Sequence, residues 1–212
     1  MKKVFMAILA AILLAPASLT AQTVEITPFA GYVFGSSWYG NGGSVYIAGN
    51  AQYGAQVSIG ISRVIDVDLI YNRSDTRAEL SGFSLIYETT PISVNYFQLG
   101  FTKNFRVNPI VSPYFGMNLG AVEFFSKDGQ YNDAWFFSAG INGGAKIYFS
   151  KRVGLKLQAQ MYLPIQGAGF TMYFGGGGPS TGVSMYSTMV QFGFTGGLVF
   201  RLGKIYNQPM PR

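Results

Sequence analysis

The chain has 212 residues, enough for one sizeable domain. Of these residues 49% are apolar and only 11% are charged, against roughly 25% charged residues in ordinary soluble proteins, so a water-facing surface is hard to build from this chain. Its net charge of +6 is mild and scattered, which excludes nucleic acid as a partner because that role needs a concentrated basic surface. The absence of cysteine excludes disulfides, thiolate metal sites and thiol redox chemistry.

The N-terminus has the layout of a secretory signal peptide. Two lysines precede an uninterrupted apolar run over 4–14, and small residues follow at Ala15, Ala17 and Ala21. We expect a signal peptide over 1–21, with cleavage after Ala21 or after Ala17. Its removal takes away two lysines and lowers the formal charge from +6 to +4.

The rest of the chain alternates between apolar and polar residues, which is the period of a β-strand. In VGLKLQAQMYLP, for example, Leu155, Leu157 and Leu163 share one parity, whereas Gln158 and Gln160 share the other. The pattern predicts eight strands, and several are long by the standards of soluble proteins. Their predicted ranges are 24–35, 52–63, 67–77, 94–105, 110–124, 135–149, 153–164 and 190–202.

The connections between these strands alternate in length. Those at 63–66, 106–109 and 150–152 are short, whereas 36–50, 79–92, 125–134 and 168–186 are long and rich in Gly, Ser, Asn and Tyr. An antiparallel meander with short turns at one end and long loops at the other is typical of an outer-membrane barrel. The fold prediction is therefore all-β, an eight-stranded antiparallel up-and-down transmembrane β-barrel over 22–203, with a periplasmic tail at 204–212 and both termini on the periplasmic side.

The composition of the two strand faces indicates which face meets lipid. In a soluble barrel the polar face would be the outer surface and rich in Lys, Glu and Asp, but here it carries mostly Gly, Ser, Gln, Asn and Thr, which suit an enclosed lumen. The apolar face has aromatic residues near strand ends, as expected of the girdles at the two membrane interfaces. Those aromatic residues are Tyr32, Phe34, Tyr53, Phe105, Phe149 and Phe200.

Four segments resemble a known family: GYVFG, SPYFGMNLGA, AGINGGAKIYFSKRVGLKLQAQMYLP and the Gly-rich aromatic last strand. They are similar to the small outer-membrane β-barrel domain family, whose relatives are the eight-stranded barrels of the outer membrane protein A and outer membrane protein X type. The resemblance implies an outer-membrane location, contact with outer-membrane lipid and insertion by the barrel assembly machinery. Barrels of this kind often end on an aromatic residue that this machinery reads, whereas this chain continues past Leu202 with GKIYNQPMPR.

Charged residues on the lumen parity form a candidate site near the short-turn end, because enclosed charges must be paired or wetted. A symmetric turn around Lys151 would place Lys146 opposite Lys156, a repulsive arrangement that needs an anion. We therefore expect Glu25 or Asp68 to reach across. The predicted lumen ion cluster consists of Glu25, Asp68, Lys146, Lys156 and Arg201. Arg201 should approach Glu25 where the last strand meets the first. Two interpretations stay open, namely internal ion pairs that plug the lumen and an ion gate in a small pore.

Catalysis and metal binding are not expected. The chain contains no histidine, the side chain that most often does acid-base work near neutral pH. Asp128 and Asp133 lack the oxygen-ligand spacing of a calcium loop, so we expect neither a metal site nor a cofactor.

The predicted function is therefore non-enzymatic, a structural or surface-interaction role through the long loops with an unknown extracellular partner. Candidate contact residues in these loops are Trp38, Tyr39, Tyr46, Tyr173 and Phe174. The alternative is a narrow pore, or a conduit for small apolar ligands, gated by the lumen ion cluster. A conduit would need an apolar upper lumen, which Phe124 and Phe136 on the lumen parity suggest.

Overall fold

The computed structural model describes residues 23–40, 43–82, 85–105, 110–127, 133–165, 168–175, 178–185 and 189–202. Side chains are described for the same ranges apart from 38–40, 43–44, 80–82, 85–88, 168–175 and 178–185. The predicted signal peptide at 1–21 and the tail at 204–212 lie outside the described residues.

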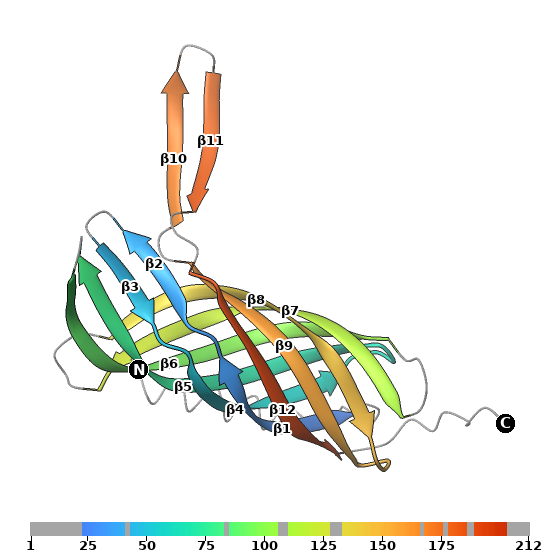
Figure 1. The fold of residues 1–212 in the computed structure, drawn as a ribbon. Helices are drawn as coiled ribbons and strands as arrows, with labels where there is room; N and C mark the ends of the chain where they lie inside the picture. Colours follow the sequence, from blue (N-terminus) through green and yellow to red (C-terminus); the bar gives the residue numbers. More distant parts are fainter. Residues whose placement is uncertain are drawn as a thin grey trace, which may run out of the picture.

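The described chain consists of strands joined by turns (Figure 1). In chain order they are β1 (Val24–Val33), β2 (Ser36–Gly40), β3 (Gly43–Ile47), β4 (Asn50–Gly60), β5 (Ile65–Gly82), β6 (Leu85–Asn104), β7 (Val111–Ser126), β8 (Ala134–Tyr148), β9 (Val153–Ile165), β10 (Ala168–Gly175), β11 (Gly178–Met185) and β12 (Gln191–Leu202). Among the described residues, no helix is long and apolar enough to cross a membrane.

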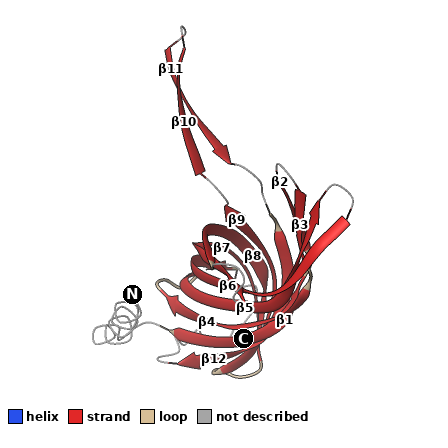
Figure 2. Ribbon diagram, turned by 90° about the vertical axis from the view of Figure 1, so that its left-hand side faces the viewer, coloured by secondary structure: helices blue, strands red, loops and turns tan. Residues whose placement is uncertain are grey.

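Eight of these strands close into an antiparallel barrel, as predicted. The ring runs β1-β4-β5-β6-β7-β8-β9-β12 and returns to β1 (Figure 2). Phe200 of β12 pairs with Ile26 of β1 and with Val153 of β9. When the register is followed from Ile26 in the other direction, through β4, β5, β6, β7 and β8, it reaches β9 at Leu163. The ring therefore closes with a stagger of ten residues, because strands of a closed barrel tilt against its axis.

The alternation of residue types decides which side chains enter the barrel. Along β9, Lys156, Gln158, Gln160 and Tyr162 are buried in the lumen, whereas Leu157 between them is exposed on the outside. Closure of the ring also pairs the backbone of all eight strands, which a structure in lipid requires. The face assignment made from composition is confirmed.

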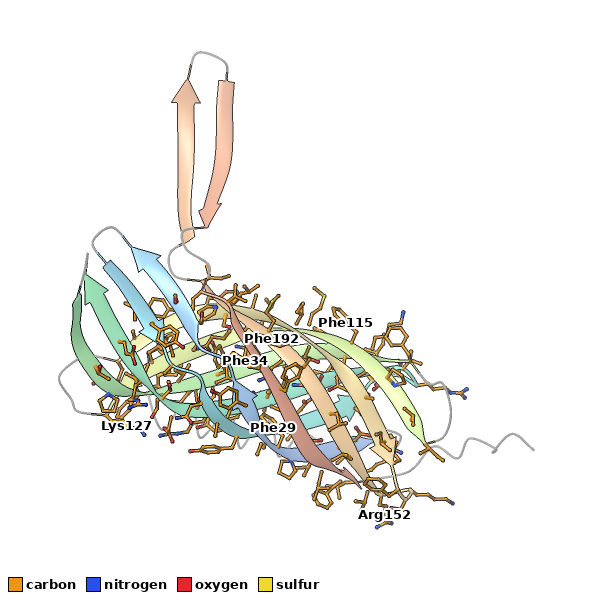
Figure 3. All side chains as sticks on the ribbon, viewed as in Figure 1. Phe29, Phe34, Phe115, Lys127, Arg152 and Phe192 are labelled. Carbon is orange, nitrogen blue, oxygen red and sulfur yellow. The ribbon has the colours of Figure 1, made fainter. Side chains whose placement is uncertain are left out.

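The outer wall is an apolar belt. Leu99, Met117 and Leu119 expose 55%, 62% and 57% of their surface, and Phe115 stands on the same outer face (Figure 3). The six aromatic residues predicted for the girdles are all exposed large apolar side chains. A soluble protein would not expose such a belt, whereas the hydrocarbon core of a bilayer would cover it.

Three of the four long connections contain strands that the sequence pattern did not predict. The 36–50 segment contains the hairpin β2-β3, the 79–92 segment continues β5 and β6 to Gly82 and Leu85, and the 168–186 segment contains the hairpin β10-β11. β3 pairs with β5 beyond the point where β4 begins. Gly, Ser and Asn have weak strand propensity, yet cross-strand pairing overrides it here. The barrel wall therefore continues past the belt at this end, which we call the loop end; the opposite end, with the turns at 61–64 and 149–152, is the turn end.

The β10-β11 hairpin lies outside the ring. It forms a separate two-stranded sheet and projects away from the barrel at the loop end (Figure 1).

Candidate functional site

Glu25 is the centre of a buried ion cluster at the turn end of the lumen. Its Oε2 lies 2.7 Å from Lys146 Nζ, and its Oε1 accepts hydrogen bonds from Arg201 Nη2 at 2.9 Å and Nε at 3.1 Å. Tyr148 Oη donates to the same Oε1 at 2.9 Å, and the Arg201 guanidinium lies 4.1 Å from the centre of the Tyr148 ring. Glu25 of β1 thus contacts Arg201, its register partner on β12, and reaches Lys146 and Tyr148 of β8 across the lumen.

Asp66 is the second carboxylate of this cluster, and the sequence analysis missed it. Lys146 Nζ lies 3.0 Å from Asp66 Oδ2, which also accepts a hydrogen bond from Asn104 Nδ2 at 2.8 Å. The predicted short connection at 63–66 includes Asp66, but β5 begins at Ile65, so Asp66 points into the lumen with the same parity as Asp68. The turn-end ion cluster, defined as Glu25, Asp66, Lys146 and Arg201, contains two acids and two bases and is neutral.

Lys146 and Lys156 face each other directly in the register of β8 and β9. Lys156 forms no ion pair with any described residue. Its Nζ donates to Gln56 Oε1 at 2.5 Å and lies 4.8 Å from the centre of the Tyr114 ring. A carbonyl dipole and an aromatic face can hold a buried ammonium, although less strongly than a carboxylate does.

Asp68 is also buried, and the structure does not pair it with a lysine. Its Oδ2 accepts a short hydrogen bond from Thr102 Oγ1, while its Oδ1 has no hydrogen-bond partner among the described residues. Asp68 and Lys156 are thus one acid and one base of the lumen without an ion-pair contact in the described structure. With the turn-end ion cluster they make the described lumen charge zero.

A column of amide side chains fills the middle of the lumen. Tyr114 Oη donates to Gln158 Oε1 at 2.9 Å, and Gln158 Nε2 donates to Gln160 Oε1 at 2.8 Å. Gln160 Nε2 and Asn72 Nδ2 both donate to Gln52 Oε1, at 2.9 and 2.7 Å. These hydrogen bonds link the buried amides into one network, in which only Asn72 Oδ1 lacks a described partner, and the side chains are at most 5% exposed within the lumen.

The lumen wall formed by β6, β7 and β8 is less well satisfied. The side chains of Gln98, Asn118 and Asn142, on β6, β7 and β8, have buried polar atoms without a described hydrogen-bond partner. Asn118 lies over Gly140, and Asn142 lies over Gly116, where a methyl group would stand 2.3 and 2.7 Å from the respective Oδ1 atoms. The glycines make room for the asparagines, so this wall is also packed.

Toward the loop end a cluster of apolar side chains enters the lumen. Tyr96 and Tyr162 stack with ring centres 4.4 Å apart, and Tyr96 Oη donates to Gln191 Oε1 at 2.5 Å. Beyond this pair Phe124 and Phe136 pack on the lumen side, as their parity suggested. The apolar lumen cluster consists of Ile47, Ile92, Val94, Tyr96, Val122, Tyr162 and Met189, with Ala78, Phe124 and Phe136 against it.

Of the candidate contact residues at the loop end, only Tyr46 has a described side chain. It is 39% exposed, and its hydroxyl end packs over Gly35, where a methyl group would stand 2.2 Å from the hydroxyl oxygen. The side chains of Trp38, Tyr39, Tyr173 and Phe174 lie outside the described residues.

The chemistry of the described site is that of a closed, charge-balanced interior. No group of three or more acidic side chains that could hold a metal ion occurs in the described part of the chain. Asp133 is exposed and Asp128 lies outside the described residues. Side chains fill the lumen with ions at the turn end, amides in the middle and apolar groups at the loop end.

No protein-family model matches this chain, and no curated protein matches it. Solved structures do. Neisserial surface protein A (NspA) is 12% identical with a TM-score of 0.57, covering 84% of this chain and 97% of that one. The outer membrane protein OprG from Pseudomonas aeruginosa is 11% identical with a TM-score of 0.55, covering 86% and 96%.

A third match is the outer membrane protein AlkL, 15% identical with a TM-score of 0.51, covering 92% of this chain and 97% of that one. At such identities these likenesses show the fold alone. The chain has the fold of a small outer-membrane β-barrel, which supports a location in an outer membrane.

Proposed function

We propose that this protein is a non-enzymatic outer-membrane barrel that acts at its loop end, in a structural or surface-interaction role. The observation that carries the proposal is the length of the strands beside a filled lumen. A tilted strand needs about 9 to 11 residues to cross the hydrocarbon, yet β5, β6 and β7 have 18, 20 and 16.

The surplus of these strands is at the loop end. β5 pairs with β4 up to Ser74 and then with β3 from Ala78 onward. The extension of the wall beyond Ser74 is therefore hydrogen-bonded β-sheet with its own register. Tyr46 is exposed on this extension, and aromatic residues of this kind anchor protein interfaces. A paired wall longer than a bilayer requires suits contact with a partner.

The orientation belongs to the same proposal. We place both termini and the turn end in the periplasm and the loop end outside the cell, because short periplasmic turns and longer extracellular connections are the rule for such barrels. The proposed partners are then outer-membrane lipid around the belt, the barrel assembly machinery during insertion, and an unknown extracellular partner at the loop end.

A binding screen tests the surface role. Vesicles carrying the refolded protein would be offered an array of glycans, matrix proteins and cells, beside a Trp38→Ala, Tyr39→Ala, Tyr46→Ala variant and a Tyr173→Ala, Phe174→Ala variant. We expect at least one ligand whose binding falls about tenfold or more in one loop variant, a loss near 1.4 kcal/mol, with unfolding unchanged. An array without loop-dependent binding contradicts the proposal.

The apolar lumen cluster favours a second candidate, a conduit for small apolar ligands. A conduit has to admit a ligand among Val94, Val122 and Met189, which are all at most 1% exposed in the packed cluster. Equilibrium binding of a fluorescent fatty acid to the refolded protein, compared with a Val122→Asn variant, decides between the two. Saturable binding lost in the variant supports the conduit, and absence of binding excludes it.

A further inference from the structure

The charges on the outside of the barrel are separated between its two ends. Of the nine acidic residues in the chain, Glu25, Asp66 and Asp68 are enclosed in the lumen. The other six lie within or next to the loop-end parts of the strands, at Asp75, Glu79, Glu88, Glu123, Asp128 and Asp133. None is left for the outer surface of the turn end.

The turn end nevertheless exposes basic side chains. Lys103 lies at the end of β6, and Lys151 and Arg152 lie in the turn between β8 and β9. All three are exposed, and Figure 3 shows Arg152 at this end and Lys127 at the other. We call these three residues the basic rim.

The cations at the loop end stand in different surroundings. Arg73 Nη2 lies 2.9 Å and Lys127 Nζ 3.2 Å from the same oxygen of Asp75. The basic rim has no described carboxylate on the outer surface beside it, because Glu25 and Asp66 are turned inward and held by Lys146 and Arg201. These basic side chains therefore form no ion pair with a carboxylate of the described residues.

The basic rim also borders the apolar belt. Phe149 and Ile110 are 69% and 58% exposed at this end, and Lys103 Nζ lies 5.6 Å from the centre of the Phe105 ring. Basic side chains that rise from apolar surface reach the headgroup level of a bilayer while their stems stay among the acyl chains. The geometry points to a contact with lipid phosphate.

We propose that the basic rim binds the headgroups of anionic phospholipids in the leaflet that surrounds the turn end. The rim presents three exposed cations at the turn end beside the apolar belt, which fits the negative surface of such a leaflet. This inference rests on the membrane-barrel fold and not on the surface-interaction role, because the loop end takes no part in it.

Lipid retention in native mass spectrometry tests the proposal. The refolded mature protein would be released from nanodiscs of phosphatidylcholine with a minor share of phosphatidylglycerol, and the lipids that stay bound would be counted. A Lys103→Gln, Lys151→Gln, Arg152→Gln variant removes three rim charges. An Arg73→Gln, Arg77→Gln, Lys127→Gln variant removes three charges at the loop end and is the matched control.

We expect phosphatidylglycerol enrichment in the wild type and in the control variant, and a loss of about fivefold in affinity for each rim charge removed. Added salt should weaken the enrichment, since exposed charges are screened. Equal retention of the two lipids in the wild type, or enrichment that survives in the rim variant, overturns the proposal. So does a loss confined to the control. None of these results bears on ligand binding at the loop end.

Discussion

Lys146 and Lys156 lie opposite each other on β8 and β9, yet only Lys146 contacts carboxylates, with Glu25 at 2.7 Å and Asp66 at 3.0 Å. Lys156 relies on Gln56 and the face of Tyr114. Removal of Lys146 therefore breaks two described ion pairs with carboxylates, whereas removal of Lys156 breaks none.

The first prediction compares Lys146→Met with Lys156→Met. Loss of Lys146 leaves Asp66 without its described ion pair, so we expect a loss of about 3 to 5 kcal/mol in the free energy of unfolding. Loss of Lys156 removes a buried ammonium that lacks a described carboxylate, and the cost should stay within about 1 kcal/mol. Urea unfolding in lipid vesicles, followed by tryptophan fluorescence, measures both. Equal losses would contradict this assignment of partners.

The second prediction concerns Glu25, which receives hydrogen bonds from Lys146, Arg201 and Tyr148. Glu25→Gln should cost about 3 to 5 kcal/mol, because two cations then lose a shared buried carboxylate. Arg201→Gln should cost less, since its side chain is 20% exposed. A double-mutant cycle of the two changes should give a coupling energy of about 0.5 to 3 kcal/mol. Additive losses would mean that the pair does not act as a unit.

The third prediction uses two adjacent glycines of β8. A methyl group on Gly144 would stand 1.9 Å from the backbone oxygen of Leu157, whereas one on Gly143 would meet nothing nearer than 3.6 Å. Gly144→Ala should therefore destabilise the barrel by about 1 to 3 kcal/mol, since β8 and β9 must move apart. Gly143→Ala should change stability by less than about 0.5 kcal/mol. The same unfolding assay reads both, and the reverse ranking would refute the register of β8 with β9.

The fourth prediction tests the outer face. Met117 is 62% exposed and its neighbour Asn118 faces the lumen. In lipid, Met117→Arg should cost about 2 to 4 kcal/mol near the middle of the bilayer, whereas Met117→Leu should be close to neutral. On a water-facing surface the arginine would be tolerated. Folding of both variants into vesicles therefore decides what the outer wall faces, and a harmless arginine would mean water.

The sequence predicted the ring well, for a physical reason. Successive side chains of β9 and β12 point alternately to the lumen and to the outside. The side that a residue faces therefore decides whether it is polar or apolar, and the resulting period of two is easily recognised in the sequence. The extension formed by β2, β3 and the far parts of β5 and β6 was not predicted. Where the wall continues past the apolar belt, the faces of a strand lack that constraint, and the alternation fades although the pairing continues.

The ion pairs were harder to predict than the wall. The placement of Lys146 opposite Lys156 follows from a symmetric turn, and the approach of Arg201 to Glu25 follows from closure. The choice of Asp66 rather than Asp68 as partner of Lys146 depends on where β5 begins, and the parity shared by Asp66 and Asp68 was the available signal. Parity says which side chains enter a lumen, but contacts across it depend on the stagger of the whole ring.

Single-channel conductance of the refolded mature protein in a planar bilayer distinguishes a filled lumen from a pore. Side chains fill the lumen from the turn-end ion cluster to the apolar lumen cluster, so we expect no discrete conductance steps for the wild type, for Glu25→Gln or for Lys156→Gln. Discrete steps whose size changes in these variants would contradict a filled lumen and make the protein a pore with the ion cluster as its gate.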